Sequence, residues 1–255
     1  MLWIIGGKKG FKSAIGLVFT FICIIYLFLP MLYKGYSPFL SAVIVIILIT
    51  IVSLYLIDGI TKKSISAMIG TIIGVIIAGI CAAGFGYVAK ISGYNVSEVE
   101  ELVFVANNTE LKVGGILFSA ILIASLGTVM DVSMSISSTL TEIYNHNKNI
   151  GRVELFKSGI NVGRDMMGTM SNTLILAFTG GSINTLILNY AYDLKHNQII
   201  NMYEIGIEIM QGVSGSIAII LSVPLVSIIS SYFLTYGRKK SLRSKINLDS
   251  ILEYN

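Results

Sequence analysis

Charged side chains are scarce in this chain. Aspartate, glutamate, lysine and arginine make up 13% of its 255 residues, whereas an average soluble domain contains roughly 25%. Hydrophobic residues make up 54%. This balance excludes an ordinary soluble globular protein and favours a protein whose surface faces lipid.

Cysteine and histidine are equally scarce, with two residues of each. Cys23 and Cys81 fall in separate apolar stretches, and His146 and His196 fall in different loops, so neither a disulfide nor a zinc site is expected. The sequence also contains no phosphate-binding glycine loop, no serine-hydrolase elbow and no zinc-protease helix motif. We therefore expect no cofactor, no bound metal and no enzymatic activity.

The apolar residues are gathered in long blocks, each close to the roughly 20 residues that a membrane-spanning helix needs. The six blocks are Ser13–Tyr33, Phe39–Ile57, Ile65–Ala89, Val113–Ser133, Gly168–Tyr192 and Ser214–Tyr236. The first block is too long for a signal peptide and no A-x-A-like cleavage site follows it, so we expect it to be retained. The sequence predicts an all-α polytopic membrane protein with about six spans in a single transmembrane domain.

The basic residues predict how this domain is oriented. With six spans, the amino terminus, the second and fourth loops and the carboxyl terminus share one side of the bilayer. Only four of the 18 lysines and arginines fall on the other side, namely Lys34, Lys90, Lys112 and Lys195. Because basic loops stay in the cytosol, both termini are predicted to be cytosolic in the plasma membrane. Residues 239–255 form a basic tail suited to the anionic inner leaflet, and no nucleic-acid partner is implied.

Two outer loops have amphipathic helical patterns. In Val96–Ala106 apolar residues alternate at helical spacing with Glu98, Glu100 and Glu101, and Gln198–Gln211 carries a polar stripe. Both patterns predict short helices on the outer membrane face. Two roles remain open for them: a gate or docking surface, or the geometry that leads the chain into its next span.

Residues 1–95 form a half with few polar residues in its spans, and its third span carries a regular stripe of small residues. A small residue recurs at every fourth position: Ser66, Gly70, Gly74, Ala78, Ala82 and Gly86. Small residues at this spacing let another helix approach closely. Gly70, Gly74 and Ala78 are therefore predicted to mediate helix packing, either within the bundle or in a dimer.

The second half, residues 96–238, differs because each of its spans has a polar line. In the fourth span the line contains Gly127, Asp131, Ser135, Ser138 and Glu142. A charge at the centre of a spanning helix costs roughly 2.5–3.5 kcal/mol, and less near its ends, so this line is expected to face the bundle interior or water. Alternatively, Asp131 caps or packs against a cytosolic extension of the helix.

The fifth and sixth spans continue the pattern. Polar residues and glycines at helical spacing are Asp165, Thr169, Asn172 and Thr179 with Gly180 and Gly181 in the fifth span, and Gln211 and Ser222 in the sixth. The segment Thr179–Ser182 is expected to interrupt its helix about halfway across, either to expose backbone groups for a binding site or to kink the helix against a neighbour.

These polar lines suggest a path for a solute. We hypothesise that Asp131, Asp165 and Asn172 line one cytosol-facing cavity that ends at the glycine pair. Two acids facing one cavity would suit a cation or a proton-coupled solute.

Three stretches resemble the YibE/F-like family of bacterial membrane proteins. They are Leu126–Ser138, Glu154–Gly159 continuing through Gly163–Ser182, and Gly215–Leu225, and the resemblance extends from about Val96 to the sixth span. It implies a polytopic, permease-like protein that resembles the shorter of two related members. It also implies a related larger membrane subunit as a candidate partner, with a homo-oligomer as the alternative.

Three functions therefore stay open. The chain is a permease with a path in its last three spans, the membrane subunit of an ABC-type transporter, or a scaffold for another membrane protein. For the ABC alternative, the cytosolic segment Thr141–Arg164 is long enough to hold a short coupling helix, and the basic cytosolic face would suit a separate ATPase.

The predicted topology can be tested with single cysteines in a Cys23→Ala, Cys81→Ala background. We expect an impermeant thiol reagent to label Asn108→Cys but not Asn147→Cys in intact cells, because the basic loops are cytosolic. The opposite labelling pattern would mean that the chain is inserted the other way round.

Overall fold

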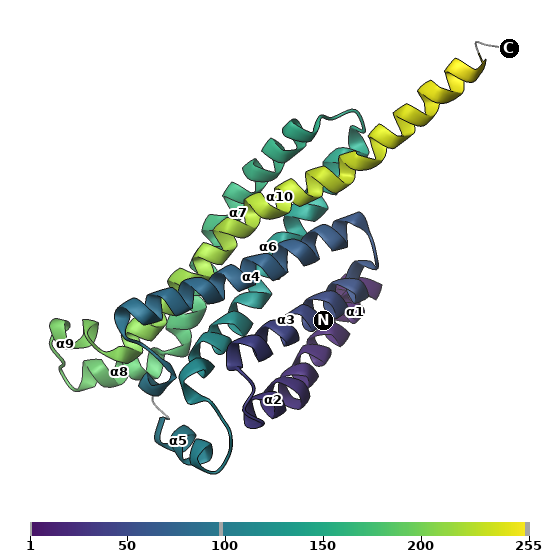
Figure 1. Ribbon diagram of the computed structural model, residues 1–255. Helices are drawn as coiled ribbons and strands as arrows, with labels where there is room; N and C mark the ends of the chain where they lie inside the picture. Colours follow the sequence, from purple (N-terminus) through teal and green to yellow (C-terminus); the bar gives the residue numbers. More distant parts are fainter. Residues whose placement is uncertain (1, 97–98, 253–255) are drawn as a thin grey trace.

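Residues 2–96 and 99–252 are described by a computed structural model, in which long helices form a bundle (Figure 1). The described residues form helices and the connections between them, so the all-α prediction is confirmed. Among these residues five helices are long and apolar enough to cross a membrane, and a bent helix pair provides a sixth span if it is counted as one.

The spanning helices lie close to the predicted blocks. They are α1 (Leu2–Cys23) continued by η1 (Ile24–Phe28) and α2 (Leu29–Tyr33), then α3 (Pro38–Asp58), α4 (Lys62–Ala89), α6 (Ile116–His146) and α10 (Tyr203–Leu252). The bent pair consists of α7 (Arg152–Gly181) and α8 (Ile183–Ala191), whose axes differ by 55°. Short elements are η2 (Gly93–Asn95), α5 (Val99–Asn107), η3 (Val113–Gly115) and α9 (His196–Ile200).

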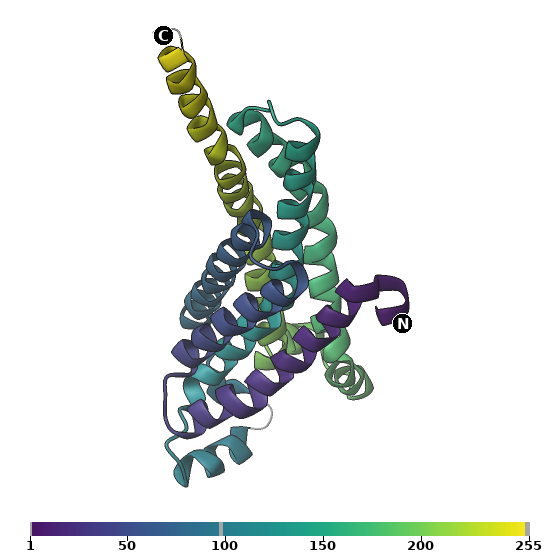
Figure 2. The same ribbon diagram turned by 90° about the vertical axis from the view of Figure 1, so that its right-hand side faces the viewer.

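The two ends of the bundle differ in structure. Figure 1 shows α5, α8 and α9 gathered at one end, and the turns after α3 and α6 at the other, where α10 also projects. We call these the outer and inner ends, following the predicted topology. Figure 2 shows the bundle from the side, with α6 and α7 running next to each other and α1 at the periphery.

The stripe of small residues on α4 faces α6 and α10 of the same chain. A β-carbon added at Gly74 would lie 2.9 Å from Val129 Cγ1 and 3.2 Å from Ser222 Cβ, and one at Gly70 would collide with Val226. Ala78 is completely buried. These contacts place α4 against the centre of the bundle.

The outer loops differ from their predicted form. The helix predicted over Val96–Ala106 corresponds to α5, while residues 97–98 lie outside the described residues. The single helix predicted over Gln198–Gln211 is wrong, because the chain forms α9, turns at Asn201 and starts α10 at Tyr203. The polar residues near 204–211 therefore belong to the outer end of the last span.

The fifth span is also longer at its inner end than predicted. The 30 residues of α7 extend about 45 Å at 1.5 Å per residue, which exceeds the roughly 30 Å of the hydrocarbon layer. The helix is continuous through Gly181, and Ser182 donates its backbone N–H to Phe178 and Thr179 at the bend. The interruption therefore lies at the outer end rather than halfway across.

The inner connection before α7 is correspondingly short. Helix α6 ends at His146 and α7 begins at Arg152, so residues 147–151 form only a turn. The segment Thr141–Arg164, which had room for a short coupling helix in the ABC alternative, therefore consists of the ends of two bundle helices joined by this turn.

The packing of α4 predicts which glycine tolerates a large side chain. We expect Gly74→Leu to lower the melting temperature in detergent, because overpacking of a tight core typically costs about 1–3 kcal/mol. Gly84→Leu on the same helix is the control, since a β-carbon there has no atom within 4 Å. Equal melting temperatures for the two variants would contradict this packing.

Candidate functional site

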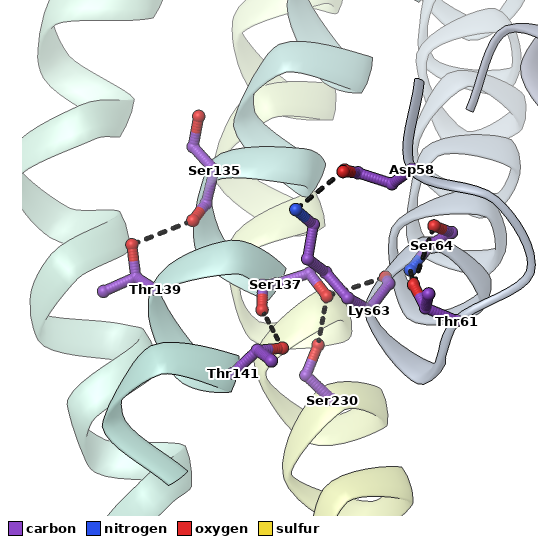
Figure 3. A network of polar contacts seen from close by, with 9 residues as sticks. All are labelled: Asp58, Thr61, Lys63, Ser64, Ser135, Ser137, Thr139, Thr141 and Ser230. Atoms are coloured by element: carbon purple, nitrogen blue, oxygen red, sulfur yellow. Dashed lines mark hydrogen bonds and ion pairs between the residues drawn. The ribbon is translucent and has the colours of Figure 1, made fainter. Parts of the chain in front are cut away.

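A network of hydrogen bonds joins the helices at the inner end (Figure 3). The Ser137 hydroxyl donates to the Lys63 carbonyl oxygen at 2.8 Å, and the Ser230 hydroxyl donates to Ser137 Oγ at 3.3 Å. Lys63 Nζ also pairs with Asp58 Oδ2 at 2.7 Å. The network ties α6 and α10 to the turn between α3 and α4, so Ser137 marks the level at which the inner end of the bundle begins.

Asp131 lies further toward the outer end than Ser137, and it is on the surface of the chain. It is six residues from Ser137 toward the outer end of α6, or about 9 Å at the helical rise. Its side chain is exposed, as is Gly127 one turn further out, whereas Ser135 is half-buried. Asp131 therefore lies within the apolar span Val113–His146, on an open face of α6.

The polar residues of α7 lie on an open face as well. The exposed positions include Asp165, Thr169, Asn172, Thr179, Gly180 and Gly181. The hydroxyls of Thr169 and Thr179 donate to carbonyl oxygens of their own helix, on Asp165 and Ile175, at 3.4 and 2.9 Å. These two threonines are therefore satisfied within α7.

The antiparallel packing of α6 and α7 brings the two polar faces to one depth. A β-carbon at Gly159 on α7 would lie 3.0 Å from Leu140 Cδ1 on α6, so these two residues are at the same level. Nine residues further toward the outer end, α7 has Gly168 and α6 has Asp131, and these two residues are therefore level with each other as well. Asp165 and Asn172 lie within about one turn of this level. The three residues of the hypothesised cavity are thus exposed at similar depths on two neighbouring helices rather than buried inside the bundle.

A cavity of about 380 Å³ opens at the outer end of the bundle. Its walls come from the outer end of α10, the α7–α8 bend, the first turn of α6 and the segment from η2 to α5. The lining includes Glu204, Glu208, Gln211, Ser182, Thr185, Ala120, Gly93 and Leu102. Two acids, an amide and two hydroxyls therefore face a space large enough for a small solute.

Glu208 is the most unusual group in this cavity. Its Oε2 atom is buried and has no hydrogen-bond partner in the described structure. The residue also lines a second cavity of about 260 Å³ beside Ile175, Phe178 and Thr179. A buried polar atom is costly unless it is paired, so Glu208 offers an unused acceptor to a ligand or a proton.

The cavity lies at the outer end of a single line along α10. Glu204, Glu208, Gln211, Gly215, Ala218 and Ser222 follow one another at alternating steps of four and three residues, which keeps them on one helix face. Beyond Gln211 the line enters the packed core, where Leu174 of α7 lies against Gly215. Ser222 is fully buried, and its hydroxyl donates to the Ile219 carbonyl at 2.8 Å.

Gln211 and Ser222 are predicted from the sequence to line the path, whereas Glu204 and Glu208 are not. Both acids had been assigned to a separate surface helix. The signal that could have found them is the four-and-three spacing, which continues outward from Gln211 without a break.

The cavity carries acidic side chains on its α10 wall. Among the described residues no group of three or more His, Cys, Asp or Glu side chains could hold a metal ion. Glu204 and Glu208 can still attract positive charge at the mouth of the cavity.

Cysteine labelling can measure how accessible the polar line along α10 is, both at the cavity, where the line is open, and in the core, where it is closed. In the Cys23→Ala, Cys81→Ala background, we expect a small impermeant cationic thiol reagent to label Gln211→Cys from outside, because Gln211 lines the cavity. Ser222→Cys, on the same helix face but in the core, should stay unlabelled. Equal labelling of both positions would contradict the closure at Leu174.

One comparison with known proteins identifies a family for this chain. The family model for the YibE/F-like protein matches residues 1–236, which includes all of the spanning helices and both polar regions. No curated protein and no solved structure matches the chain. Because the match covers far more than half of the sequence, the chain belongs to the YibE/F-like family of membrane proteins.

Proposed function

We propose that the protein is a permease of the plasma membrane that moves a small cation, and that the outer cavity is where this cation first binds. The observation that carries the proposal is the unpaired, buried carboxylate oxygen of Glu208 in a cavity that also contains Glu204 and Gln211. Ionisable groups within spanning helices are costly and mark ion or solute pathways.

The line along α10 supports a path that continues inward from the cavity. Gly215 and Ala218 are small, and Ser222 supplies a hydroxyl on the same face. The path is closed where Leu174 meets Gly215, so passage requires α7 to move relative to α10. Movement of helices around a site is the usual way in which transporters alternate access.

The α7–α8 bend supports the same function. Ser182 and Thr185 bring polar groups from the bend into the cavity, facing the acids of α10. The bend lies at the outer end of the span, where its irregular backbone borders the cavity. The bend thus joins the site to the helix that would have to move.

The ABC-type alternative has less support. The turn of residues 147–151 leaves no separate cytosolic helix for an ATPase to contact in the loop where one was expected.

Currents across a reconstituted membrane test this proposal. Purified protein in liposomes would be exposed to concentration jumps of Na⁺, K⁺, Mg²⁺ and ethylammonium. We expect a current with at least one of these cations, and we expect Glu208→Gln to abolish most of it, because the variant keeps the shape of the side chain and removes its charge.

Glu101→Gln is the matched control, because Glu101 is an exposed acid on α5 at the same end of the bundle. It should retain the wild-type current. Equal currents in Glu208→Gln and wild type would remove the cavity from the path. Currents no larger than those of protein-free liposomes for every cation would contradict a cation permease.

A further inference from the structure

An exposed polar surface at membrane depth is the feature that the proposed function does not use. We define the α6–α7 face as Gly127 and Asp131 on α6 with Asp165, Gly168 and Asn172 on α7, all of them exposed. Carboxylates and an amide at this depth are strongly disfavoured against lipid. The face therefore needs a protein or water covering that the single chain does not provide.

The glycines on this face leave room for a protein covering. Where α7 meets α10, a β-carbon at Gly163 would collide with Val223, and one at Gly215 would collide with Leu174, so these glycines permit close helix contact. At Gly127 and Gly168 a β-carbon would have no atom within 4 Å. Glycine weakens a helix, and here the chain itself makes no close contact that would require it.

We propose that the α6–α7 face packs against the same face of a second copy of this chain. In a pair related by a two-fold axis along the membrane normal, each residue meets residues of the partner at its own depth. Gly127 and Gly168 would then allow close approach, as small residues do between membrane helices. This inference does not rest on the transport proposal.

The charges on the face favour a second copy over an unrelated partner. Arg164 is exposed on α7, four residues and about 6 Å inward of Gly168, next to Asp165. Its long side chain can reach an acid at the level of Asp131 on a facing molecule. An acid on the face and a base at its edge, about one helical turn apart in depth, let the surface pair with a second copy of itself.

Asn172 adds to this self-complementarity. A carboxamide is both a donor and an acceptor, so two copies of Asn172 can bond to each other across a two-fold axis. Hydrogen bonds of this kind between membrane helices stabilise their association. An aliphatic partner surface would leave both Asn172 and Asp131 unpaired.

Cysteine cross-linking in native membranes tests the pairing. Two full-length forms with different epitope tags would be co-expressed in the Cys23→Ala, Cys81→Ala background, each carrying Gly168→Cys, Gly127→Cys or Asn172→Cys. These exposed positions have room for a cysteine, and a disulfide requires Cα atoms about 4.4–6.8 Å apart. Under oxidation we expect a band at twice the mass of the chain that carries both tags, for at least one of the three positions.

Ile220→Cys is the matched control, since Ile220 is 45% exposed on α10 at a similar depth. It should stay at the mass of one chain. Adding Arg164→Glu to a variant that cross-links should weaken the double-mass band, because it replaces the base of the proposed ion pairs with a third acid. Adding Arg164→Lys instead keeps the positive charge and should leave the band in place. A cross-linked product that carries one tag and another mass would assign the face to a different protein and overturn the proposal. No product at any of the three positions would overturn it too.

Discussion

Close backbone contact around α10 is the constraint on which the rest of this structure depends. In a bilayer the side chains of separated helices are already in an apolar medium, so packing rather than the hydrophobic effect holds helices together. Here α4 contacts α10 at Gly70 and Gly74, and α7 contacts it at Gly159 and Gly163. Because α4 and α7 have glycines at these contacts, α10 can lie at the centre of the bundle, and the inner part of its polar line is covered.

The same packing explains why the two ends of the molecule differ. At the inner end, the hydroxyl of Ser137 joins α6 to the first turn of α4, and Ser230 adds α10 to this network. At the outer end α7 stops at Gly181 and bends away, so the first turns of α10 lose a neighbour. The cavity is what remains where α7 no longer covers α10, and Glu204 and Glu208 occupy the uncovered turns.

Much of the fold could be predicted from the sequence because long apolar blocks have few alternatives in a membrane. The α3 and α4 boundaries lie within a few residues of the predicted blocks. The fifth span is predicted to begin at Gly168, whereas α7 begins at Arg152. Residues 152–167 are amphipathic, and hydropathy alone does not distinguish an amphipathic helix from a polar loop. The small-residue spacing of α4 was informative, since Gly74 has the contacts on α6 and α10 that this spacing requires.

The candidate site was harder to predict for a physical reason. Helical spacing tells which residues share a face of one helix, but it does not tell what lies opposite that face. Asp131 and Asn172 were therefore assigned to an internal cavity, whereas the structure places them on the surface of the chain. Glu208 is not predicted as a site residue because the sequence places its segment in a helix on the membrane surface. In the structure, one of its carboxylate oxygens is buried.

The two polar regions meet in α7, and this makes α7 the helix that can couple them. Its outer end contributes Ser182 to the cavity, its middle places Leu174 over the closed part of the α10 line, and its open face carries Asn172. Within the chain α7 packs mainly against α10 and α6, so one side of it is free of its own bundle. A shift of α7 that withdraws Leu174 from Gly215 would necessarily move Asn172 relative to whatever covers the open face. Pairing of two copies through that face would therefore link the opening of one path to the position of its neighbour, because the same rigid helix closes the path and forms the contact.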